Sequence, residues 1–82
     1  MTEFKLKDYN ETRVIYYYYP EGDKYPGEVE YTFTTKTANA LTRAANDETG
    51  YYSRKAILKL EEKFATCIDE NRLPFRFTQA WC

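Results

Sequence analysis

The chain has 82 residues, of which 18% are aromatic and 30% charged, so its composition favours one small folded domain, residues 1–82, over a disordered segment. Its formal net charge of −1 gives no overall attraction to nucleic acid or to an anionic membrane. The sequence lacks histidine, the side chain most used in acid–base catalysis near neutral pH and the commonest metal ligand. We therefore expect no enzyme: no catalytic residues, no metal site and no cofactor.

The two cysteines, Cys67 and Cys82, are too few for a small disulfide scaffold and predict a reduced protein of the cytoplasm. Residues 1–13 are polar and mixed in charge, so they lack the apolar stretch of a secretory signal. No apolar run approaches the roughly 18 residues that a membrane span needs. We expect a cytoplasmic protein that does not contact a membrane.

The first half of the chain predicts a β-hairpin. Residues 12–19 are rich in β-branched and aromatic side chains and end at Pro20, which is typical of a strand. Residues 20–27 hold two prolines and two glycines and predict a loop. Residues 27–35 alternate between apolar and polar side chains, as a half-buried strand does. The side chains expected to face the core from this second strand are Val29, Tyr31 and Phe33.

The second half predicts one long helix. Residues 37–45 fit either a short helix or a strand, and we favour a third short strand. Residues 51–69 carry an apolar stripe at helical spacing, with Ser53 as the expected N-cap or with a start a few residues earlier. The stripe consists of Ile57, Leu60, Phe64, Cys67 and Ile68. Residues 75–82 predict a last strand, or an extended tail anchored by Trp81.

These elements predict an α+β fold, with a three- or four-stranded antiparallel sheet and one long helix packed on one face. The hairpin register is open, because an eight-residue loop does not fix it. If Pro20 and Gly27 bracket that loop, Tyr18 lies opposite Val29 and Tyr16 lies opposite Tyr31. A slip by one residue would exchange the two faces of the first strand.

Short motifs in the second half resemble those of a group of small proteins from low-GC Gram-positive bacteria, their phages and mobile elements. The motifs are AND at 45–47, GYY at 50–52, AI at 56–57, LEE at 60–62, LP at 73–74 and AW at 80–81. Cys82 stands where that group has an aromatic residue. The resemblance implies a β-meander followed by a helix, in a phage or mobile-element setting. That group has no assigned activity, so the resemblance implies no site residues.

The run of four tyrosines at residues 16–19 places aromatic rings on both faces of its strand. We expect Val14, Tyr16 and Tyr18 to face the helix. The opposite face is the candidate contact surface, because tyrosine is enriched at protein interfaces. Its candidate binding residues, with one more from the loop, are Ile15, Tyr17, Tyr19, Glu28, Glu30 and Tyr25. The alternative is an ordinary solvated sheet face.

The expected function is binding to another protein, or to a second copy as a homodimer, through this aromatic and acidic sheet face. A phage protein of this kind would act on a host protein, for example as an inhibitor. The alternative is a single-stranded nucleic-acid binder that uses the same tyrosines together with Lys55, Lys59 and Lys63 on the helix. We expect no nucleic-acid partner, because the glutamates beside the tyrosines repel phosphate. A small hydrolase is the third alternative.

Overall fold

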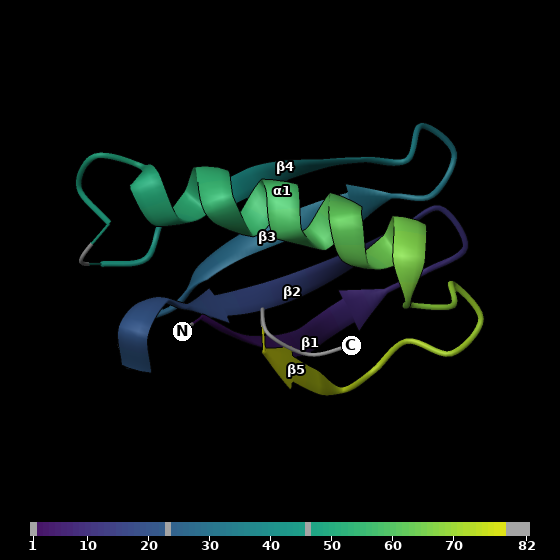
Figure 1. Cartoon of the computed structure of the whole chain (residues 1–82), viewed down its shortest axis with the longest axis horizontal. Coiled ribbons are helices and arrows are strands. Elements are labelled where there is room, and N and C mark those ends of the chain that lie inside the picture. The colour runs from purple at the N-terminus through teal and green to yellow at the C-terminus, as the bar shows by residue number, and fades with distance from the viewer. Residues whose placement is uncertain (1, 23, 46, 79–82) are drawn as a thin grey trace.

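The computed structural model describes residues 2–22, 24–45 and 47–78. Within them, five strands form one antiparallel sheet in the order β4-β3-β2-β1-β5, and one long helix lies on it (Figure 1). The elements in chain order are β1 (Glu3–Tyr9), β2 (Arg13–Tyr19), the 3-10 turn η1 (Pro20–Gly22), β3 (Gly27–Thr32), β4 (Thr37–Thr42), α1 (Tyr51–Thr66) and β5 (Arg76–Thr78). The α+β class is confirmed, but the sheet has five strands rather than three or four.

The unexpected strand is β1, which lies between β2 and β5. Its side chains alternate: Phe4 is buried in the core, whereas the neighbouring Glu3 and Lys5 pair across the other face with Tyr19 and Tyr17. Residues 1–13 predicted no strand, because charged residues outnumber apolar ones there. A strand with one solvated face needs only every second residue to be apolar.

The hairpin register differs from the predicted one by two residues. Tyr18 pairs with Gly27 and Tyr16 pairs with Val29. A shift by two residues leaves every side chain on its original face, because side chains alternate with a period of two. The pairing was therefore wrong and the assignment of faces is confirmed: Val14, Tyr16 and Tyr18 are fully buried.

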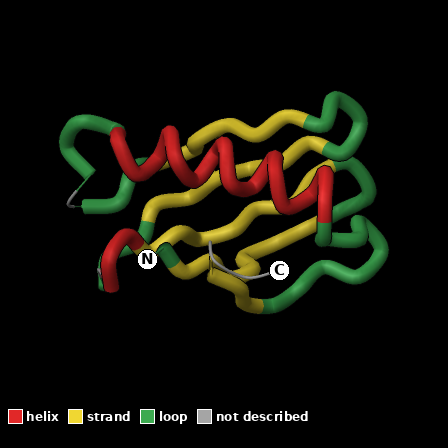
Figure 2. The backbone as a smooth tube through the Cα atoms, in the orientation of Figure 1, coloured by secondary structure: helices red, strands yellow, loops and turns green. Residues whose placement is uncertain are grey.

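The helix crosses the sheet over β3 and β4, as the tube in Figure 2 shows. Leu60 is fully buried, and the ring of Phe64 stacks on that of Tyr31 at 4.2 Å between centroids. Ala38 of β4 also donates its N–H to the Glu61 carboxylate of the helix, at 2.9 Å. The predicted packing of the apolar helix stripe on the second strand is therefore confirmed.

The helix starts at Tyr51, so the earlier of the two expected starts is the observed one and the cap differs from the expected Ser53. Gly50 is the N-cap, in the left-handed conformation with φ 76°. Ser53 is not the cap; its hydroxyl donates to the Gly50 carbonyl. The side chain that serves the helix start is Asp47, whose carboxylate accepts hydrogen bonds from the N–H groups of Tyr52 (3.0 Å) and Ser53 (2.8 Å). The expected short third strand is confirmed as β4.

The helix ends at Thr66, so Cys67 follows it and is half-buried. Cys67 is disulfide-bonded, so the prediction of a reduced core cysteine was wrong. The expectations for Trp81 and Cys82 fall on residues 79–82, outside the described residues. Within the described part of the chain, no helix combines the length and the apolar character that a bilayer crossing requires.

Candidate functional site

The sheet face opposite α1 carries most of the predicted binding residues. We call it the open sheet face. Among the described elements, only strands form this face, because α1 packs on the opposite one. All five strands contribute to it, β4 through uncharged residues such as Asn39 beside Glu30. The residues of β1, β2, β3 and β5 considered on this face are Glu3, Lys5, Lys7, Asp8, Arg13, Ile15, Tyr17, Tyr19, Glu28, Glu30 and Arg76.

The two outward tyrosines lie side by side, each with a lysine over its ring. The ring centroids of Tyr17 and Tyr19 are 6.4 Å apart, and both side chains are half-buried. The Lys7 ammonium lies 5.5 Å from the Tyr17 centroid, and Lys5 lies 5.0 Å from that of Tyr19. Each such contact stabilises by about 0.5–1 kcal/mol at an exposed position. The lysines therefore hold the rings in place and cover part of their outer surface.

Ion pairs link the strands of this face. Lys7 of β1 binds Glu28 of β3 at 2.6 Å, and this pair spans the intervening strand β2. The hydrogen bond from Lys7 to Glu28 raises the pKa of the lysine above its ordinary value. Arg13 lies 3.5 Å from Glu30, a second pair that joins β2 to β3. Both predicted glutamates are thus engaged by cations.

The expectation of an acidic face was therefore wrong. It rested on Glu28 and Glu30, whereas β1 and β5 bring further charges to the same surface. Arg76 of β5 lies 3.5 Å from Glu3 of β1. The cations of the face, Lys5, Lys7, Arg13 and Arg76, match the carboxylates Glu3, Asp8, Glu28 and Glu30 in number. The surface is mixed and close to neutral.

Two of the predicted binding residues are not accessible side chains of the open sheet face. Ile15 is 8% exposed, so it packs beneath its neighbours and we withdraw it as a contact residue. Tyr25 is 57% exposed on the loop before β3, with Lys24 5.6 Å from its ring centroid. Its carbonyl accepts a hydrogen bond from Ala45, which follows β4. No described contact joins its ring to Tyr17 or Tyr19.

The lysine row of the helix is not one open surface. Lys63 is 6% exposed, Lys59 lies 3.4 Å from Glu62, and Lys55 lies over the Tyr51 ring at 5.1 Å. The spacing of four residues does place them along the helix, but burial removes one and a carboxylate pairs with another. These lysines do not form the phosphate-binding face that the nucleic-acid alternative required.

The sequence reasoning missed Lys5, Lys7 and Arg76, which frame the tyrosines. The signal was present in the alternation of residues 3–6, where Phe4 and Leu6 separate charged side chains. No comparable signal in the sequence marks Arg76 as the neighbour of Glu3, because that contact depends on pairing between the first and the last described strand.

No family model, curated protein or solved structure matches the chain. The functional argument is therefore carried by the fold and by the geometry of its surfaces.

Proposed function

We propose that this chain is a small, non-enzymatic binding protein that contacts another protein through the open sheet face. The observation that carries the proposal is the pair Tyr17 and Tyr19 on a sheet face that the described elements leave uncovered. Rigid tyrosine rings beside charges of both signs suit a protein surface, because the rings supply contact area and the charges fix orientation. The partner should itself present both charge signs.

The biological setting is part of the same proposal and rests on other grounds. A phage or mobile-element protein that acts on a host protein is supported by the resemblance of the motifs at 45–81. A cytoplasmic location remains a prediction, and the disulfide bond of Cys67 counts against it because that compartment keeps thiols reduced.

The test is a binding comparison between two faces of the molecule. Purified chain is first measured by size exclusion with light scattering, which reports whether a second copy is the partner. A Tyr17→Ala/Tyr19→Ala variant is then compared with Tyr51→Ala in capture of host proteins. Tyr51 is a matched control, since it is a 48% exposed tyrosine on the helix with a lysine over its ring.

The proposal requires that Tyr17→Ala/Tyr19→Ala no longer captures the partner protein, or no longer forms the dimer. It also requires that Tyr51→Ala still does so. Capture that survives the double substitution would show that the open sheet face is not the contact surface. Melting curves of both variants identify any loss caused by unfolding.

Single-stranded nucleic acid is the second candidate, because the structure places Lys5, Lys7, Arg13 and Arg76 around the tyrosines. Base-stacking sheets combine aromatic rings with such cations. Against this candidate, three of the four cations are paired with carboxylates and lysines lie over both rings. Fluorescence anisotropy with labelled single strands at physiological salt should show no micromolar binding. Micromolar binding that Lys5→Glu abolishes would reverse the ranking.

A further inference from the structure

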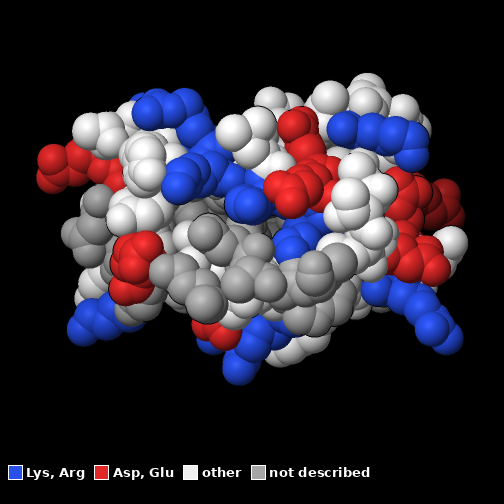
Figure 3. Space-filling model, in the orientation of Figure 1, with Lys and Arg blue, Asp and Glu red and all other residues white. Residues whose placement is uncertain are grey.

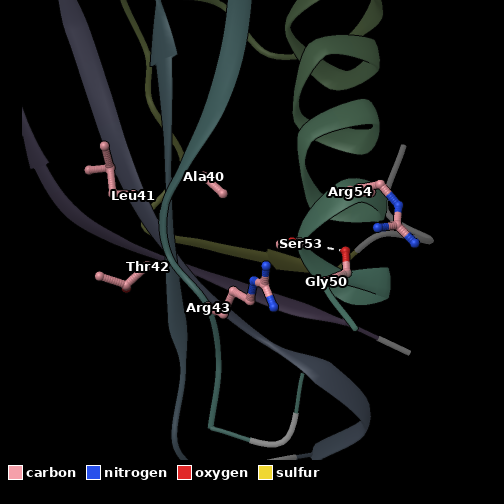
Figure 4. A pocket seen from close by; sticks show the side chains of 7 residues that line it. All are labelled: Ala40, Leu41, Thr42, Arg43, Gly50, Ser53 and Arg54. Carbon is pink, nitrogen blue, oxygen red and sulfur yellow. Dashed lines mark hydrogen bonds between the residues drawn. The ribbon is translucent and has the colours of Figure 1, made fainter. Parts of the chain in front are cut away.

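A hollow of about 380 Å³ lies between the end of β4 and the first turn of α1, away from the open sheet face (Figure 4). One wall is formed by residues 40–42 of β4 and by Arg43, which follows the strand, and the other is formed by Gly50, Ser53 and Arg54. Both walls end in an arginine. In Figure 4, Arg43 projects from the strand toward Gly50 and Ser53, and Arg54 projects from the helix.

The two guanidinium groups lie on either side of Gly50 in Figure 4. A Cβ atom placed on Gly50 would lie 3.5 Å from Arg54 Nη1 and 3.6 Å from Arg43 Cζ. These two atoms are therefore at most 7.1 Å apart, the sum of both distances. A glycine at this position leaves open the space between the cations, which a side chain would fill.

Each arginine is fixed by the same short loop. Arg43 Nη1 donates to the carbonyl of Glu48 at 2.8 Å, and Arg54 Nη1 donates to the carbonyl of Thr49 at 3.2 Å. Consecutive carbonyls thus orient both groups while using one of the five N–H donors of each. The remaining donors are available to a ligand.

Neither arginine has a carboxylate partner among the described residues, whose ion pairs involve other cations. The nearby carboxylate of Asp47 is 2% exposed and accepts hydrogen bonds from Tyr18, Tyr52 and Ser53. Asp47 also occupies the first N–H groups of α1, so the helix start is not what would hold a ligand here. Figure 3 shows Lys and Arg side chains gathered over the N-terminal half of α1.

We propose that the hollow between Arg43 and Arg54 is a binding site for a phosphate-class oxyanion. Two planar guanidinium forks match the geometry of a tetrahedral oxyanion and repel one another without one. A doubly charged phosphate neutralises both cations, whereas a carboxylate neutralises one.

The test is a titration followed by NMR through the main-chain amides and the arginine Nε–H signals, at constant ionic strength in chloride. The three probes are inorganic phosphate, phenyl phosphate and acetate. We expect saturable shifts confined to Arg43, Gly50, Ser53 and Arg54 with both phosphates. Tighter binding of phenyl phosphate would assign the site to phosphate esters, and equal binding would assign it to free phosphate. Acetate that binds as tightly as phosphate would overturn the proposed ligand class.

The variants Arg43→Gln and Arg54→Gln should each weaken phosphate binding at least tenfold. Arg72→Gln, which removes another exposed arginine at the turn after the helix, is the matched control and should leave binding unchanged. Arg54→Lys keeps the charge and removes the fork, so it should bind more weakly than wild type and more tightly than Arg54→Gln. Absence of saturable shifts in the wild type, or their persistence in Arg43→Gln and Arg54→Gln, would refute the site. The amide spectra of the variants report directly that they are folded.

Discussion

The hydroxyl of Tyr18 donates a hydrogen bond to Asp47 Oδ2 at 3.2 Å, joining the centre of the sheet to the loop before the helix. The same hydroxyl accepts the N–H of Ala44 at 3.1 Å. Two residues earlier on the strand, Tyr16 donates to the carbonyl of Pro74 at 2.7 Å, in the loop after the helix. The buried half of the tyrosine run therefore joins the loops before and after α1 to one strand.

Replacing Tyr18 with Phe keeps the ring and removes this junction. The buried N–H of Ala44 then lacks its acceptor and Asp47 loses a donor, which should lower the free energy of unfolding by about 1–3 kcal/mol. Tyr17→Phe, on the open sheet face, is the control and should change it by less than about 0.5 kcal/mol. Urea unfolding of the two proteins measures both. Equal stability of the two variants would contradict the role given to the Tyr18 hydroxyl.

The carboxylate of Asp47 should make the fold sensitive to acid. Burial alone raises the pKa of this group, but hydrogen bonds from Tyr52, Ser53 and Tyr18 outweigh it and the pKa lies below its ordinary value. A lowered folded pKa means that the stabilisation is present above the unfolded pKa, about 4, and is lost as the pH falls through the folded pKa. The urea concentration at the midpoint of unfolding should therefore decrease as the pH is lowered below about 4. This decrease should be less steep in Asp47→Asn than in the wild type.

Asn is an acceptable capping residue, so Asp47→Asn should still fold. Asp69→Asn, in the exposed turn after the helix, is the matched control and should retain the wild-type acid dependence. If Asp47→Asn loses stability with acid as steeply as the wild type does, the dependence belongs to other carboxylates.

The sequence predicted the layout of this fold from its strongest patterns. Two patterns each bury one face: the alternation of residues 27–35 and the helical stripe around Leu60 and Phe64. A periodic pattern of this kind predicts which face of an element packs on the core. The two-residue error in the hairpin shows what a pattern leaves out: it specifies the face of a strand and not its partner. Pairing depends on the loop, whose left-handed Glu21 (φ 46°) no periodicity indicates.

The candidate site was predicted less completely than the fold. Tyr17 and Tyr19 lie on the expected face, because their side follows from the burial of Tyr16 and Tyr18. The charges around them could not be predicted, since Lys7 and Glu28 are 21 positions apart in the chain and their side chains meet across the intervening strand β2. A surface formed by several strands has a net charge that no single segment of the sequence shows.

Gly27 should resist substitution because of its partner in the sheet. It pairs with Tyr18, and a Cβ atom at this position would lie 2.3 Å from Tyr18 Cε1 and 2.6 Å from the main-chain nitrogen of Ala44. Gly27→Ala must therefore displace a buried ring and the main chain just after β4, and should cost about 3 kcal/mol, at the upper end of ordinary overpacking.

Gly50→Ala separates this steric effect from backbone strain. Its Cβ would make contacts of 3.5 Å or more, but its φ of +76° disfavours any side chain, so we expect a loss of about 1 kcal/mol. Thermal and urea unfolding should rank the stabilities as wild type, Gly50→Ala and Gly27→Ala. A Gly27→Ala protein that is as stable as the wild type would contradict the pairing of Gly27 with Tyr18.

The last strand should contribute to the core although it is only three residues long. The ring of Phe77 stacks on Phe4 at 4.7 Å between centroids and meets the edge of Tyr16 at 5.2 Å, and Phe77 is 3% exposed. Phe77→Ala should therefore lower the free energy of unfolding by about 3–5 kcal/mol, the usual loss for a buried aromatic side chain. Phe75, two residues earlier and 68% exposed, is the control, and Phe75→Ala should change stability by less than about 0.5 kcal/mol.

A double-mutant cycle with Phe4→Ala should give a coupling of about 0.5–1.5 kcal/mol between the stacked rings. If Phe77→Ala melts with the wild type, β5 does not pair with β1 in solution, and Arg76 then has no fixed place on the open sheet face.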